Sequence, residues 1–196
     1  VSGNGAYVHM TLLAKDIQGL HNLFRLSSLG SLEGQYYKPR LDRELLAAHS
    51  RGLIATTGCA GGEVATRLRL GQYDAARQAA AELTDVFGRD SFYVEVMDHG
   101  AAVERRYYDD LMRLRKELDL PVLATNDLHY THAADAQAHE VLLCVQSAST
   151  LADPNRFRFD GTGYHLKSPT EMRELWRELP DACDSTLLVA EQIEDY

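Results

Sequence analysis

The chain alternates short apolar runs, which are typical of buried strands, with longer stretches whose apolar residues recur at the spacing of an amphipathic helix. The strand-like runs lie at residues 6–13, 53–57, 92–97 and 120–125. The helix-like stretches lie at residues 17–32, 63–70, 73–87, 103–118, 131–144 and 182–191. Because strands that are separated by helices usually pair in parallel through right-handed crossovers, the pattern predicts an α/β fold with a parallel sheet.

The last quarter of the chain has a looser pattern. Residues 151–166 contain turn-forming residues and predict an ordered surface excursion. The run Ser168-Pro169-Thr170-Glu171 predicts the start of a further helix, with Ser168 as N-cap, proline at the first helical position and Glu171 closing a capping box. We therefore expect two parts, at residues 1–145 and 146–196.

Composition narrows the class of protein. With 196 residues, 45% of them hydrophobic and 25% charged, the chain can bury one core, and it contains no apolar run of the roughly 18 residues that a membrane span needs. Its start lacks the pattern of a signal peptide, and the three widely spaced cysteines favour a reducing cytoplasm. The net charge of −9 disfavours general binding of nucleic acid by this chain alone.

Residues with metal-binding or catalytic chemistry follow successive strand-like runs. Cys59 follows the second run, Asp98 and His99 follow the third, and Asp127 and His129 follow the fourth, while His9 lies near the end of the first. Functional groups of parallel α/β folds gather at the carboxyl ends of the strands. In extended chain, side chains two residues apart point to one side, so Asp127 and His129 would converge on one spot.

Each of these residues also has a simpler interpretation. Asp127 could cap the following helix beside a hydrogen-bonded His129, and the Asp98-His99 pair could form a turn. Cys59 could be a small buried residue or a nucleophile at a helix N-terminus. Taken together, however, imidazole, thiolate and carboxylate groups suit zinc and neighbouring divalent ions, and such a mixed set is more typical of a catalytic than of a structural site.

Several segments carry a resemblance to a known family. In this order and at these spacings, GNGAYVHMTLLAKDIQGLHNLFRLSS, EGQYYKPRLDRELL, GLIATTGCAGGEV, FYVEVMDHG, VLATNDLHY, AHEVLLCVQ and YHLKSPTEM resemble the PHP (polymerase and histidinol phosphatase) domain of bacterial DNA polymerase III alpha subunits, in an actinobacterial style. The resemblance covers essentially the whole chain. It implies part of a distorted (β/α)7 barrel at residues 1–145, and the end of that domain with a connection toward the polymerase palm at residues 146–196.

The resemblance also implies a site. The metal ligands of the family correspond to His9, Cys59, Asp127 and His129, with Asp127 and His129 closest to the chemistry, and the ions expected are zinc or manganese, with magnesium as a further choice. His99 would donate a hydrogen bond to one of these ligands without contacting the metal itself. The basic residues at 38–40, 105–106 and 156–158 are candidate phosphate or interdomain contacts, although solvated charged faces are the simpler interpretation.

Three functions follow as expectations. The first is DNA synthesis by the replicative polymerase together with a metal-dependent 3′–5′ proofreading exonuclease, acting on the primer 3′ end. The second is a non-catalytic scaffold that stabilises the polymerase and binds replisome partners such as the sliding clamp and the proofreading subunit. The third, a stand-alone phosphoesterase, is disfavoured because AHEVLLCVQ and the tail resemble the link to a polymerase palm.

The chain departs from the family pattern in one respect. The His-x-His motif of the family and its next Asp, His and Glu ligands are expected before residue 1, and the polymerase palm after residue 196. The resemblance therefore predicts that this sequence is a fragment, without nuclease activity of its own.

Overall fold

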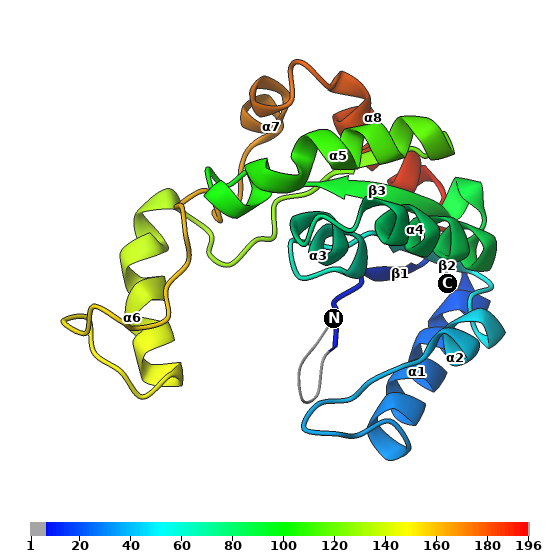
Figure 1. Cartoon of the computed structure of the whole chain (residues 1–196), viewed down its shortest axis with the longest axis horizontal. Helices are drawn as coiled ribbons and strands as arrows, with labels where there is room; N and C mark the ends of the chain where they lie inside the picture. Colours follow the sequence, from blue (N-terminus) through cyan, green and yellow to red (C-terminus); the bar gives the residue numbers. More distant parts are fainter. Residues whose placement is uncertain (1–6, 196) are drawn as a thin grey trace.

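The computed structural model describes residues 7–195 and contains a mixed α/β fold (Figure 1). Its sheet has the strand order β1 (Leu12–Ala14), β2 (Leu53–Thr56), β3 (Phe92–Val96) and β4 (Val122–Ala124). The helices are α1 (Ile17–Leu32), α2 (Arg43–Ala48), α3 (Glu63–Arg69), α4 (Tyr73–Phe87), α5 (Ala102–Leu118), α6 (Ala136–Gln146), α7 (Pro169–Leu175) and α8 (Pro180–Glu191). The predicted α/β class is confirmed.

Strand pairing agrees with the prediction for three strands and contradicts it for the first. Strand β2 pairs in parallel with β3, and β3 pairs in parallel with β4. Strand β1, however, pairs antiparallel with β2. Strand β1 is also shorter than the predicted run at 6–13, of which Ala6 lies outside the described residues. His9 was predicted inside this strand, but it lies before it and forms an isolated bridge with Gly62.

The connection between β1 and β2 explains the antiparallel pairing. The backbone N–H of Lys15, which follows β1, donates to the carbonyl of Gly52, which precedes β2, at 2.9 Å. The start of β2 therefore lies beside the end of β1, at the same end of the sheet. Two helices connect these strands, because α2, which the sequence pattern did not indicate, follows α1. Gly19 and Gly52 permit this contact, since a Cβ on Gly19 would lie 1.9 Å from the Gly52 oxygen.

The two faces of the sheet have different partners. One face carries Phe92, Val94 and Val96 into the main core, which helices α3, α4 and α5 complete. On the other face, Ile54, Tyr93 and Leu123 from three neighbouring strands pack against Val189 of α8. All three parallel strands, β2, β3 and β4, are buried along their length, as the continuous apolar runs indicate.

Beyond β4 the chain leaves the sheet. Helix α6 and the segment that follows it lie to one side of the sheet layers (Figure 1). Residues 147–167 contain no helix or longer strand, and the segment returns through a parallel bridge between Tyr130 and His165. The predicted capping box at Ser168 and Glu171 is present and starts α7. Among residues 7–195, no helix combines the length and the apolar character that a membrane crossing requires.

Candidate metal centre

His9 and Cys59 both lie close to Gly61. The backbone N–H of His9 donates to the Gly61 carbonyl at 3.2 Å, which holds the strand-like segment before β1 against the loop that follows β2. A Cβ added to Gly61 would lie 3.5 Å from Nδ1 of His9 and 3.6 Å from Sγ of Cys59. An imidazole nitrogen and a sulfur therefore border the same small space.

The loop that carries Cys59 is a tight turn between β2 and α3. Gly58 has φ 76°, and the N–H of Gly62 donates to the Cys59 carbonyl at 2.8 Å, which closes the turn. The Gly61 N–H lies 3.4 Å from the Cys59 sulfur and donates to it. Cys59 is half-buried, so the interpretation as a fully buried small residue does not hold, whereas Cys144 and Cys183 are buried.

Asp127 and His129 form a second pair after β4. His129 Nδ1 lies 2.6 Å from the Asp127 carbonyl oxygen and 3.9 Å from Oδ1 of the same residue. When Nδ1 donates its proton to that carbonyl, Nε2 of the neutral ring keeps its lone pair free, which is the usual arrangement of a metal-binding histidine. The backbone N–H of His129 donates to the Tyr164 carbonyl at 2.9 Å and fixes the position of the residue.

The turn at Asp127 is strained. Its φ is 37°, a left-handed value that costs a residue with a Cβ energy, although aspartate tolerates it better than most. The preceding residue, Asn126, holds the turn in place: its Oδ1 accepts from Lys167 Nζ at 2.6 Å and its Nδ2 donates to the His165 carbonyl. Burial lowers the pKa of Lys167, whose ammonium group donates to Asn126 and to the Gly163 carbonyl.

His99, which follows β3, contacts the backbone of the same turn. Its side chain is buried, and Nε2 lies 2.7 Å from the Asn126 carbonyl oxygen while Nδ1 lies 2.5 Å from Glu104 Oε1. Burial opposes the charge on this ring, but the hydrogen bonds to Glu104 and to Asn126 outweigh it and raise the pKa of His99. Its neighbour Asp98 accepts from the Gly100 N–H at 2.8 Å, so the turn interpretation is confirmed for Asp98.

Aromatic rings surround His129. The rings of His139, Phe159 and Tyr164 lie 5.4, 4.7 and 5.6 Å from it. Burial, followed by the effect of His129, lowers the pKa of His139, and burial raises the pKa of Tyr164 to about 12. Both groups are therefore neutral near pH 7.

The two pairs do not form a closed metal site in this structure. Within residues 7–195, no group of three His, Cys, Asp or Glu side chains lies close enough together to hold a metal ion. His9 and Cys59 come together, and so do Asp127 and His129. That all four share one centre stays a prediction.

Comparison with known proteins identifies the family. Residues 2–99 match the family model described as "PHP domain". The chain belongs to the PHP domain family. The matched residues include the first of the two donor pairs, His9 and Cys59.

Curated relatives match the PHP chain over its whole length. It is 57% identical over 197 residues to the DNA polymerase III subunit alpha of Saccharopolyspora erythraea, and 54% identical over 198 residues to that of Mycobacterium tuberculosis. These alignments cover all of this chain but only 16% and 17% of the relatives. The subunit alpha of Thermus aquaticus is 44% identical over 91% of this chain and 14% of its own length.

Some residues around the candidate site of the PHP chain were not predicted. Tyr164 and Phe159 reach His129 from a segment more than 25 positions away, and nothing in the local sequence indicates that contact. Glu95 was also missed, although a charged residue in the apolar run of β3 is a recognisable signal. Its side chain is buried near the end of the strand and accepts hydrogen bonds from the hydroxyl groups of Thr56 and Thr125.

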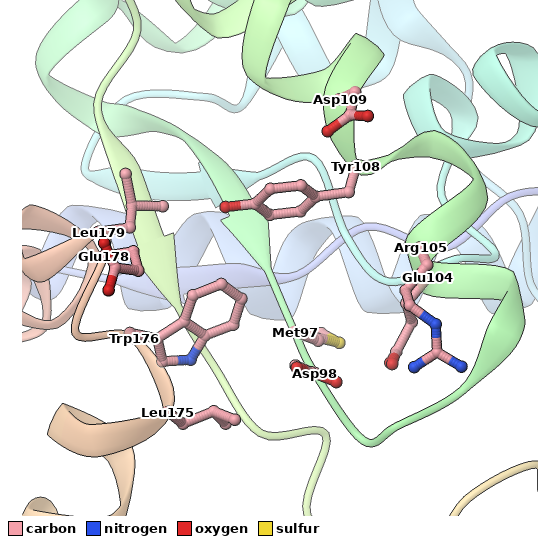
Figure 2. Close-up of a pocket in the computed structure, with 10 residues that line it drawn as sticks. All are labelled: Met97, Asp98, Glu104, Arg105, Tyr108, Asp109, Leu175, Trp176, Glu178 and Leu179. Atoms are coloured by element: carbon pink, nitrogen blue, oxygen red, sulfur yellow. The ribbon is translucent and has the colours of Figure 1, made fainter.

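A separate cavity of about 420 Å³ lies between α5 and the turn that joins α7 to α8 (Figure 2). Figure 2 shows the rings of Tyr108 and Trp176 facing each other across it, with Asp98 and Glu104 at the end of β3 and the start of α5. The indole N–H of Trp176 is buried and has no hydrogen-bond partner. None of the four candidate ligands lines this cavity.

Proposed function

We propose that this chain is the PHP region of a DNA polymerase III alpha subunit, and that its donor residues serve a metal-dependent 3′–5′ exonuclease in that cytoplasmic protein. The similarity to alpha subunits along the whole chain supports the first part. The observation that carries the second part is the arrangement of His129, whose Nδ1 is engaged by the Asp127 carbonyl so that Nε2 is available to a metal ion. Residues 1–145 would form the C-terminal part of the barrel domain, and residues 146–196 the end of that domain and its connection toward the palm.

The donor residues fit a divalent ion. The space beside Gly61 is bordered by an imidazole nitrogen and a sulfur, and the loop after β4 offers a carboxylate and a second imidazole. Such a mixed set suits zinc or manganese. His9, Cys59, Asp127 and His129 would hold the ions together with further ligands, and bound metal would supply two-metal hydrolysis of a terminal phosphodiester.

The residues of this chain prepare the site in a definite way. His99 and Lys167 hold Asn126, and through it they keep the Asp127 turn in its strained conformation. The side chains of Asp127 and His129 remain 43% and 31% exposed, so a 3′-terminal nucleotide can approach them. The neutral rings of Tyr164 and His139 line the approach without adding charge.

A scaffold role is the second candidate, and a specific observation favours it. Among the described residues no three potential ligands are grouped as a metal site. In that case the domain would stabilise the polymerase and bind replisome partners, such as the sliding clamp and the proofreading subunit, and any bound metal would only stabilise the fold.

The test uses an alpha subunit that contains this chain. Asp127→Asn should abolish chelator-sensitive shortening of a labelled primer from its 3′ end, while nucleotide incorporation persists, because incorporation uses another domain. Asp98→Asn is the matched control, since Asp98 follows the neighbouring strand and accepts a hydrogen bond from Gly100 within its own turn. Unchanged primer shortening in Asp127→Asn would favour the scaffold role, and equal loss of both activities would indicate unfolding.

A further inference from the structure

A polar layer crosses the sheet at the ends of its three parallel strands. Glu95 of β3 is 5% exposed, and its carboxylate accepts hydrogen bonds from the hydroxyl groups of Thr56 at the end of β2 and Thr125 just after β4. The distance from Thr125 Oγ1 to Glu95 Oε1 is 2.6 Å. On the same face, one step back along the strands, lies the apolar cluster that contains Tyr93 and Leu123.

Within the described part of the chain, no cationic side chain pairs with this carboxylate. None of the ion pairs found within residues 7–195 includes Glu95, and its side-chain hydrogen bonds come from neutral hydroxyl groups. Burying a carboxylate without a cation is costly, and two hydroxyl donors offset only part of that cost. A core that needed nothing more than packing here would be served by an apolar residue of similar size.

Glu95 is connected to both loops that carry candidate ligands. Toward Cys59, the Thr56 hydroxyl that donates to Glu95 also accepts from the Gly58 N–H at 3.1 Å. The backbone N–H of Glu95 donates to Thr57 Oγ1 at 3.0 Å. Toward Asp127, Thr125 lies two residues before the aspartate and binds the other carboxylate oxygen.

We infer that Glu95 is a positioning residue of the metal centre. Its carboxylate holds the β2 and β4 loops at a fixed separation through Thr56 and Thr125, and its negative charge, located beneath the strand ends, favours divalent cations between the two donor pairs. This inference rests on the proposed function, because it requires that the donor pairs bind metal. It differs from a purely structural role, in which the hydrogen bonds matter and the charge does not.

Two substitutions separate the charge from the hydrogen bonds. Glu95→Gln keeps the shape, and its amide can still accept from one threonine hydroxyl and donate to the other, but the charge is lost. Thr125→Val keeps the charge and removes one hydrogen bond. Both are made in an alpha subunit that contains this chain, and Co²⁺ is the probe because absorption from a thiolate–cobalt bond reports its contact with Cys59.

The expected result is that Glu95→Gln weakens Co²⁺ binding by about tenfold or more and reduces the thiolate–cobalt absorption. A loss of this size is typical when a residue that supports the metal ligands is replaced. Its melting temperature in the presence of a chelator should not fall. Thr125→Val should lower that melting temperature and weaken Co²⁺ binding less. Wild-type Co²⁺ affinity and absorption in Glu95→Gln would overturn the inference.

A third variant, Asp127→Asn, shows whether a negative result concerns only the role of Glu95 or the proposed function as well. If Asp127→Asn weakens Co²⁺ binding and Glu95→Gln does not, the metal centre stands and the role of Glu95 is wrong. If neither substitution affects Co²⁺ binding, both proposals are wrong.

Discussion

His99 Nε2 lies 2.7 Å from the carbonyl oxygen of Asn126, the residue immediately before Asp127. A buried imidazole at the end of β3 thereby fixes the loop that follows β4, and Glu104 holds the other ring nitrogen. The imidazole of His99, after β3, is thus in contact with the strained turn after β4, where φ of Asp127 is 37°. Proton binding at His99 should therefore affect the stability of this part of the fold.

The stabilising effect of His99 should decline as the pH rises. Its pKa is raised in the folded chain, against burial, by its hydrogen bonds to Glu104 and Asn126. The stabilisation is thus fully present below the pKa of an unfolded histidine, about 6.5, and is lost as the pH rises through the folded-state pKa. In urea unfolding with a chelator between about pH 5.5 and 9, the free-energy difference between wild type and His99→Gln should be largest at low pH. A difference independent of pH would contradict this.

Asn126→Ala should destabilise the chain by about 1–3 kcal/mol, because it leaves the half-buried Lys167 ammonium group without one of its acceptors and the His165 carbonyl without its donor. Urea unfolding monitored by circular dichroism measures the effect. Asn155→Ala is the control: Asn155 is an exposed residue of the neighbouring segment, and its loss should change the free energy of unfolding by less than about 0.5 kcal/mol. Equal effects of both substitutions would argue against the role of Asn126.

The strands and helices were largely predictable because the apolar patterns that define them are local. The parallel strands β2, β3 and β4 bury every residue, so they stand out as continuous apolar runs. The antiparallel pairing of β1 was not predictable in this way. It depends on the contact between Lys15 and Gly52, which lie on either side of a long connection and carry no sequence signal for each other.

The candidate site was predictable in part for the same reason. Asp127 and His129 do lie together, with 3.9 Å between Nδ1 and Oδ1, but the extended chain from which this was predicted is wrong, because Asp127 has φ 37° and a turn brings the two residues together. The rings that enclose His129 come from a segment without regular structure, so no periodicity points to Tyr164 or Phe159. Glu95 could have been found, because a carboxylate near the end of an apolar strand needs hydrogen-bond partners when it is buried.

Gly61→Ala should weaken metal binding and leave folding intact. The added methyl group would make ordinary contacts of 3.5 Å with His9 Nδ1 and 3.6 Å with Cys59 Sγ, and it would fill the space between these two donors. Gly61 is not in the left-handed region, so the free energy of unfolding with a chelator should change by less than about 0.5 kcal/mol. Zn²⁺ affinity measured by calorimetry on an alpha subunit that contains this chain should fall.

Gly58→Ala is the matched control for that experiment. Gly58 has φ 76°, and a Cβ there would lie 2.8 Å from the His9 carbonyl oxygen, so this substitution should lower stability with or without metal. Unchanged Zn²⁺ affinity in Gly61→Ala would mean that His9 and Cys59 do not hold an ion between them.

This 196-residue chain by itself should show no metal-dependent nuclease activity, whether manganese, zinc or magnesium is added. Its described residues bring the candidate ligands together in pairs and form no group of three, so an ion would be held by too few donors to stay in a fixed position. The measurement is incubation of a 5′-labelled primer with the purified chain and each metal in turn. Stepwise shortening from the 3′ end that a chelator stops, and that is lost in His129→Ala, would contradict the prediction and would mean that the donors of this chain suffice.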